Sequence, residues 1–168
     1  MGQVIANASM SLDGYIAKHD NTIGRLFDWL QNGDIEIPTV NPDITLHMST
    51  ASANVMRSWL DGLGALVCGR TLFDFTGGWG GTHTMNVPVV VVTHQVPVDW
   101  VEAHPDAPFH FVTDGVQAAV AKAREIAGER NVCHSRDHRP AVPRDRAARR
   151  GRHRPGARDH GPGSPVLR

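Results

Sequence analysis

Two apolar runs, Ala65–Cys68 and Val87–Val92, constrain the fold of this chain more than any other feature. A strand with one solvated face alternates apolar and polar residues, whereas a run without alternation is typical of a strand covered on both faces. Such strands occur mainly in parallel sheets that carry helices on each side. The two runs therefore predict an α/β fold with a mainly parallel sheet flanked by helices.

The segments around these runs alternate between strand and helix patterns, as a βαβ arrangement requires. Helical spacing of apolar residues predicts helices from Ser49 or Ser52 to Leu60, ended by Gly62 and Gly64, and from Val116 to Ala127, ended by Gly128. The remaining predicted elements are strands at Gln3–Ser9, at Pro108–Val112 and from Val132, a helical turn at Leu26–Leu30, and a turn at Leu72–Phe75 capped by Thr71. Residues 34–48 carry two prolines and no clear period, so they are predicted to be irregular.

The bulk properties favour a cytoplasmic protein. The 168 residues suffice for one domain with a sizeable core. The sequence has no run of about 18 apolar residues that could span a membrane, and no secretory signal pattern. Two cysteines do not make a disulfide framework. Cys133 and the histidines at 134, 138, 153 and 160 match no usual ligand spacing, so no metal site is predicted.

The overall net charge of zero conceals two oppositely charged parts. Residues 1–130 hold 7 Lys and Arg against 14 Asp and Glu, whereas residues 131–168 hold 10 Arg against 3 Asp. The second part is also rich in Pro, Gly and His and has almost no large apolar residues. Such a composition cannot bury enough surface to fold alone and predicts a disordered basic tail.

A loop, Asn7–Ala17, follows the first predicted strand and contains the pair Asp13–Gly14, which is typical of a turn. Its sequence, ASMSLDGYIA from Ala8, is followed in order by FDWLQNGD, by ASANVMRSWLDGLGALVCGRTLFDFTGGWGG, by VPVVVVTH and by FHFVTDGVQAAVAKAREIAGERNV. Together these segments resemble the dihydrofolate-reductase-like superfamily. The resemblance is to the branch that shares the reductase domain of the bifunctional riboflavin-biosynthesis deaminase-reductase, and it covers residues 3–132.

This resemblance implies an NADPH-dependent reductase of a small heterocyclic or carbonyl substrate, acting by hydride transfer. The expected activity is like that of a 5-amino-6-ribosylaminouracil reductase or a dihydrofolate reductase, with NADH as an alternative cofactor. Homodimers are common in the family, so a homodimer is expected if the C-terminal strands are present. Neither a membrane nor a nucleic acid is expected as a partner of the reductase.

The resemblance also implies the site residues. The cofactor is expected to contact Ala8, Ser9, Gly69, Arg70, Thr71, Thr93 and His94, and the substrate Ser11, Asp13, Gly14 and Trp79, with Asp13 as the one catalytic candidate. His94 stands where related chains often carry an arginine for the 2′-phosphate, which leaves the choice between NADPH and NADH open.

Each of these residues has a purely structural alternative. Gly69–Thr71 would suit an anion at a helix N-terminus, or it could be a simple turn with Arg70 in a surface ion pair. Asp13 could orient or protonate a substrate, or it could only hold Gly14 in an Asx turn. Trp79 and His83 could cover a planar ring, or they could only pack a loop.

The resemblance stops after residue 132, which divides the chain into a reductase domain, 1–132, that lacks its C-terminal strands and helix, and a tail, 133–168. The tail could be a basic arm of a non-enzymatic protein that binds nucleic acid or an acidic partner. We favour a shift of reading frame near Val132–Ser135, because Arg, Pro, Ala, Gly and His dominate GC-rich DNA read out of frame. The missing elements would leave the apolar faces of strands 65–68 and 87–92 uncovered and one central strand with an unpaired edge. We therefore expect the chain to be unstable or inactive.

Overall fold

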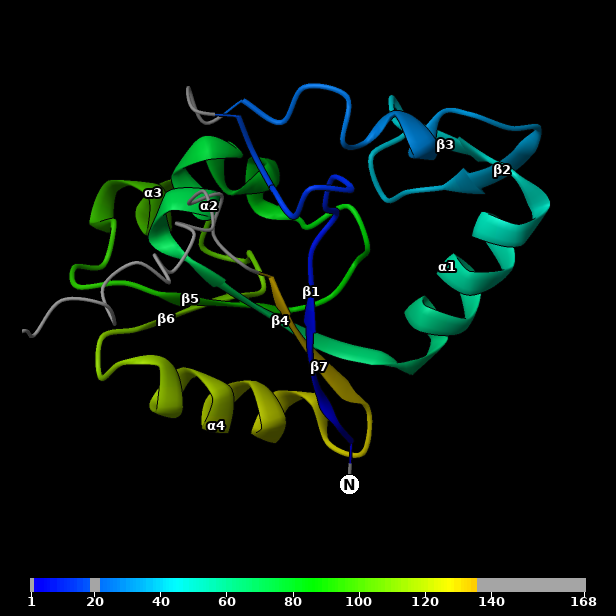
Figure 1. Cartoon of the computed structure of the whole chain (residues 1–168). Helices are drawn as coiled ribbons and strands as arrows, with labels where there is room; N and C mark the ends of the chain where they lie inside the picture. The colour runs from blue at the N-terminus through cyan, green and yellow to red at the C-terminus, as the bar shows by residue number, and fades with distance from the viewer. Residues whose placement is uncertain (1, 19–21, 136–168) are drawn as a thin grey trace, which may run out of the picture.

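The computed structural model of the chain describes residues 2–18 and 22–135, and its centre is a five-stranded sheet (Figure 1). The strand order is β1 (Val4–Asn7), β7 (Asn131–Ser135), β4 (Leu63–Gly69), β5 (Val89–Val92) and β6 (Phe109–Val112). Every neighbouring pair in this sheet is parallel. The predicted α/β fold with a mainly parallel sheet is confirmed.

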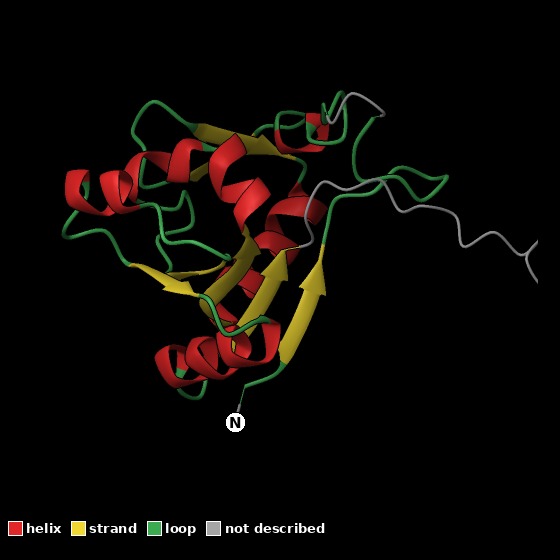
Figure 2. Cartoon of the chain, turned by 90° about the vertical axis from the view of Figure 1, so that its left-hand side faces the viewer, coloured by secondary structure: helices red, strands yellow, loops and turns green. Residues whose placement is uncertain are grey.

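Helices cover both faces of the sheet, as the two apolar runs predict (Figure 2). On one face lies α4 (Val116–Ala127), which places Ala119, Ala123 and Ala127 against β4, β5 and β7. These small side chains bring the helix close to the sheet. The other face carries α2 (Arg70–Phe75) and α3 (Val98–Ala103), whose Phe73 and Trp100 form an aromatic cluster with Phe109 and Phe111.

A third unit lies beside the sheet and consists of α1 (Thr50–Gly62) and a two-stranded antiparallel sheet. The Ser49 hydroxyl caps α1 by accepting the Ser52 N–H, which confirms one of the two predicted caps. The prediction that residues 34–48 are irregular is wrong, because β2 (Ile35–Pro38) pairs with β3 (Thr45–Met48). The alternate residues Leu46 and Met48 face the same small core as Ala53 and Met56 of α1.

Three further local predictions need correction, and one helix was not predicted. Thr71 does not cap α2, because the helix already begins at Arg70 and its N-cap is Gly69, without a side-chain cap. Gly64 does not end α1 but lies inside β4. The turn expected at Leu26–Leu30 is a 3-10 helix at Asp28–Leu30. The helix that was not predicted is α3, which has six residues.

The predicted uncovered core faces are not found in the part of the chain that the structure describes. Ala65–Cys68 are all buried, and Val89, Val90 and Val91 are fully buried between the two helix layers. The unpaired edges instead belong to β1 and β6, which within residues 2–18 and 22–135 pair only with β7 and β5, respectively. The expectation of uncovered faces was wrong because α2, α3 and α4 suffice to cover these strands.

β7 runs to Ser135, past the predicted boundary at residue 132. Residues 136–168 lie outside the described residues, so the disordered tail, the basic arm and the reading-frame shift stay predictions. Both cysteines are buried and unbridged, as core residues would be. No helix within the described ranges is long and apolar enough to cross a membrane.

Candidate functional site

The connections of the sheet single out one end of β4 and β7. The helices that follow β4 and β5 lie on one face, whereas α4, which follows β6, lies on the other and leads back to β7 between β1 and β4. Along the chain, strands are therefore added on one side of β4 as far as β6, and β7 is then added on the other side of β4. In open α/β sheets, ligands bind outside the carboxyl ends of the strands, so the carboxyl ends of the central strands are where a site is expected.

A cavity of about 750 Å³ lies at this position. The ends of β1 and β7, one side of α1, and the segments 23–30 and 72–85 form its walls. Its described lining has an apolar part with four tryptophan and phenylalanine residues besides Trp79, namely Phe27, Trp29, Trp59 and Phe75. The polar residues of the described lining carry no charge near pH 7. They are Asn7, Ser9, Ser52, Thr76, His83, Thr84 and Ser135. Within the described ranges, no Asp, Glu, Lys or Arg lines this cavity.

A left-handed turn places Trp79 in the cavity wall. Gly78, Trp79 and Gly80 have φ angles of 61°, 50° and 65°, a conformation that glycine adopts freely and a bulky residue rarely does. The glycines on both sides therefore permit a turn in which only Trp79 carries strain. The Trp79 ring lies edge-to-face against His83, with the ring centroids 4.7 Å apart. Strain of this kind is typical of functional sites, where surrounding contacts hold a residue in place.

His83 is buried beside Trp79, with 9% of its surface exposed. The Met85 N–H donates to His83 Nδ1 at 3.2 Å, and burial lowers the pKa of the imidazole to about 4. The ring is therefore neutral near pH 7. Because Nδ1 accepts, the proton lies on Nε2. His83 thus offers a neutral N–H donor at the cavity wall.

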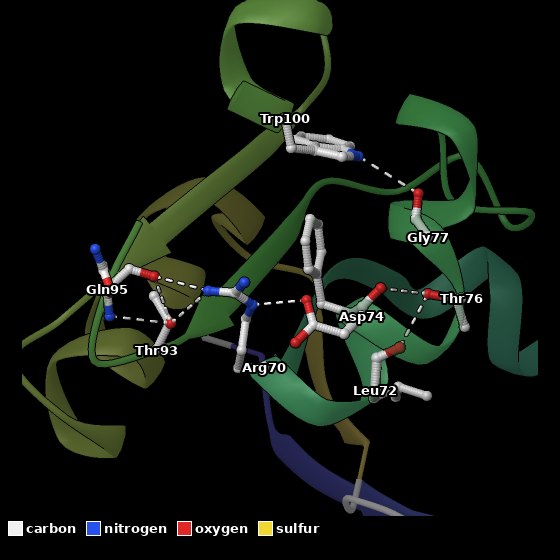
Figure 3. Close-up of polar contacts among 9 residues, drawn as sticks. Arg70, Leu72, Asp74, Thr76, Gly77, Thr93, Gln95 and Trp100 are labelled. Atoms are coloured by element: carbon white, nitrogen blue, oxygen red, sulfur yellow. Dashed lines mark hydrogen bonds and ion pairs between the residues drawn. The ribbon is translucent and has the colours of Figure 1, made fainter. Parts of the chain in front are cut away.

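The predicted cofactor residues Arg70 and Thr93 come together at the carboxyl ends of β4 and β5 (Figure 3). Arg70 Nη1 donates to the Gln95 carbonyl at 2.9 Å and to Thr93 Oγ1 at 3.4 Å. Arg70 Nε donates to Asp74 Oδ1 at 2.7 Å, so the ion pair of the structural alternative is also present. A second hollow of about 510 Å³ begins beside these side chains and extends to Asp99 and Trp100.

The opening loop is folded on itself. Ser11 Oγ donates to Asp13 Oδ1 at 2.5 Å and accepts the Tyr15 N–H at 3.0 Å, while the Gly14 N–H donates to the Ser11 carbonyl at 2.9 Å. Asp13 is exposed, and its carboxylate accepts the Ser11 hydroxyl. Ser11 is thus the residue that holds Gly14, at φ 92°, and not Asp13 as the Asx-turn alternative expected.

The structure brings some of the predicted site residues together and leaves others apart. Ser9 and Trp79 line the large cavity, where Ser9 Oγ accepts the Trp29 indole N–H at 3.3 Å. Ala8, Ser11, Asp13 and Gly14 do not line it, and neither do Gly69, Arg70, Thr71, Thr93 and His94. The roles of these residues stay predictions. The α1 side of the cavity was missed, because only tertiary packing brings Met56 and Trp59 to it.

Comparisons with known proteins add the following findings. No protein-family profile matches the sequence, and no curated protein matches it. Among solved structures, the chain is similar to the crystal structure of a protein from Shewanella sp. PV-4 that is provisionally described as a riboflavin biosynthesis protein. The identity is 21% and the TM-score 0.46, over 80% of this chain and 64% of that protein. The chain thus spans less than two thirds of the length of this structural neighbour.

Proposed function

We propose that the chain is an NAD(P)H-dependent reductase that transfers a hydride to a small heterocyclic or carbonyl substrate. One observation carries this proposal. Arg70 and Thr93 lie at the carboxyl ends of β4 and β5, at the same end of the sheet as the large cavity. A dinucleotide is long and anionic at its centre, so it needs a cationic or N–H-rich surface beside a pocket for its ring. Arg70 and the residues at the ends of β4 and β5 would provide the cationic surface, and the cavity would provide the pocket for the ring.

The residues present fit such a cofactor. The Arg70 guanidinium uses Nε and Nη1 for protein partners, and its side chain is 38% exposed, so it can still reach a phosphate. Gly69, Thr71, Thr93 and His94 would line the path of the dinucleotide, with Ser9 near its nicotinamide end. The bound cofactor would supply the hydride, and a proton from solvent would complete the reduction of a C=O or C=N bond. The protein would position the two rings and exclude water.

A preference for NADPH would depend on Arg70. His94 is a weaker phosphate partner than an arginine, because an imidazole lacks the permanent charge and the forked N–H donors of a guanidinium. Asp74 also competes for the Arg70 guanidinium. We therefore propose that both cofactors bind and that NADPH binds more tightly through Arg70.

The test is a calorimetric titration of the full chain with NADPH and with NADH. Arg70→Ala should weaken NADPH binding about tenfold, which is about 1.4 kcal/mol, because a charge-assisted contact is lost. Arg57→Ala is the matched control, since Arg57 is an exposed arginine on α1 and does not line either hollow. Absence of binding by both cofactors, or equal binding by wild type and Arg70→Ala, would refute the proposal.

A further inference from the structure

The charge of the cavity wall limits what the cavity can bind. The described lining has no ionised side chain, and His83 is neutral near pH 7. A phosphate, carboxylate or ammonium group that entered would lose its hydration without gaining an opposite charge, which is costly in an apolar site. Tryptophan and phenylalanine rings on several sides favour a planar ligand, because aromatic faces and edges pack well against flat rings.

One buried donor in this wall has no hydrogen-bond partner among the described residues. His83 Nδ1 already accepts the Met85 N–H, so Nε2 carries the proton. No hydrogen bond from Nε2 is found to any described residue, although nine-tenths of the His83 surface is buried. A buried donor without an acceptor is unfavourable, so a ligand that brings an acceptor to this position gains affinity.

The Trp79 turn holds the His83 ring from a second side. The indole lies edge-to-face against the imidazole at an interplanar angle of 70°, and the left-handed backbone from Gly78 to Gly80 holds the indole in place. The histidine is therefore held on one side by the Met85 N–H and on another by the Trp79 ring. A ligand ring would meet a rigid donor and not a mobile side chain.

We propose that the cavity binds an uncharged planar ring that presents a carbonyl oxygen or a ring nitrogen to His83 Nε2–H. The inference that this ring is the substrate rests on the proposed reductase function, but binding itself does not. For the substrate ring, the proposal disfavours a phosphorylated or carboxylated side arm in the cavity and a positive charge on the ring. His83 is a positioning residue for the ligand and not a proton donor in the reaction.

Four probes separate charge from hydrogen bonding in calorimetric titrations of the full chain. Coumarin is planar and neutral and has a carbonyl acceptor, whereas naphthalene has a similar shape without an acceptor. Coumarin-3-carboxylate is coumarin with an added negative charge. 1-Methylquinolinium has a shape similar to naphthalene and carries a positive charge. We expect each charged probe to bind at least about tenfold more weakly than its neutral counterpart.

Variants at His83 then test the donor. His83→Phe should reduce the affinity ratio of coumarin to naphthalene by about tenfold, whereas His83→Gln, which keeps an N–H donor, should retain most of it. His110→Phe is the control, because His110 lies on β6 near Lys122 and Glu125 of α4, on the opposite face of the sheet. An unchanged ratio in His83→Phe, equal binding of the charged probes, or no binding of any probe would overturn the inference.

The same protein samples, titrated with NADPH, keep this inference separate from the proposed function. The expected probe pattern without NADPH binding would support the cavity assignment and refute the reductase. NADPH binding without the probe pattern would support the reductase and refute the assignment of the ligand class.

Discussion

At the scale of single residues, His83 shows how burial determines the charge of a side chain. Its imidazole is buried against Trp79, and this burial lowers its pKa from 6.5 to about 4 in the folded state. In the unfolded chain the imidazole would titrate near 6.5. Between these two values, the unfolded state binds a proton that the folded state does not, so acid favours unfolding.

The first prediction follows from this difference. The contribution of His83 to stability is complete above pH 6.5 and is lost as the pH falls through about 4, where the loss reaches about 3 kcal/mol. His83→Gln removes the titrating group, so its urea midpoint should fall less than that of the wild type between pH 7 and pH 4.5. Parallel loss of stability in both proteins over this range would contradict the assignment.

At the scale of elements, close packing of α4 on the sheet depends on Gly64. A Cβ at this position would lie 2.7 Å from Ala127 Cβ and 2.8 Å from Ala127 Cα, far inside ordinary contact distance. Ala127 belongs to the face of α4 that covers β4. The backbone of β4 can approach α4 at this point only because residue 64 has no side chain.

The second prediction is that Gly64→Ala lowers the free energy of unfolding by about 1–3 kcal/mol, because the helix must move away from the sheet. Gly62→Ala provides the comparison. At the end of α1, its added Cβ meets only the Asn131 side-chain nitrogen at 3.1 Å, so we expect a change below about 1 kcal/mol. Equal denaturation midpoints for the two variants would show that α4 does not pack as described.

The elements also show what sequence patterns can and cannot predict here. β4, β5 and α4 were predictable because their apolar patterns are long enough to indicate burial or period. The β2–β3 pair was missed because each strand has four residues and β2 ends in a proline. α3 is a six-residue helix whose Trp100 packs on Phe73, a contact that no local pattern reveals.

The candidate site follows the same division. Arg70 and Thr93 were predictable neighbours, because residues that follow adjacent parallel strands meet at one edge of a sheet. The apolar cavity was not, since α1 and the segment 72–85 reach it only through tertiary packing. Asp13 was placed in the site by resemblance alone. In the structure its carboxylate accepts a hydrogen bond from the Ser11 hydroxyl.

At the scale of the whole molecule, β1 and β6 are the two edge strands of the described sheet, and β1 is the more exposed of the two. Val4 is 36% exposed, and the neighbouring loop exposes Met10 and Leu12. An edge strand with apolar residues is a template for pairing with another chain. We predict weak, reversible self-association, which Val4→Lys should reduce by placing a charge on the edge. Val116→Lys, on exposed α4, should leave the sedimentation-average mass unchanged. Equal masses for Val4→Lys and the wild type would exclude β1 as the contact.

A further prediction concerns residues 136–168. A truncated chain, 1–135, keeps every described strand and its partner, whereas a deletion from residue 133 would remove part of β7. We expect the 1–135 chain to melt cooperatively within about 2 °C of the full chain. A larger decrease would mean that the removed residues stabilise the sheet.

The same truncation tests the basic-arm alternative. Salt-dependent binding of nucleic acid that disappears with this truncation would favour that alternative.

The position of β7 between β1 and β4 has a consequence for synthesis on the ribosome. The strand made first, β1, contacts the sheet through the strand made last among those described, and Val4 pairs with Val132. β4, β5 and β6 can assemble while the chain is still being made, but β1 must wait until residue 135 has left the exit tunnel. The N-terminal strand and its exposed apolar side chains therefore stay open to chaperones until the whole described sheet has been made.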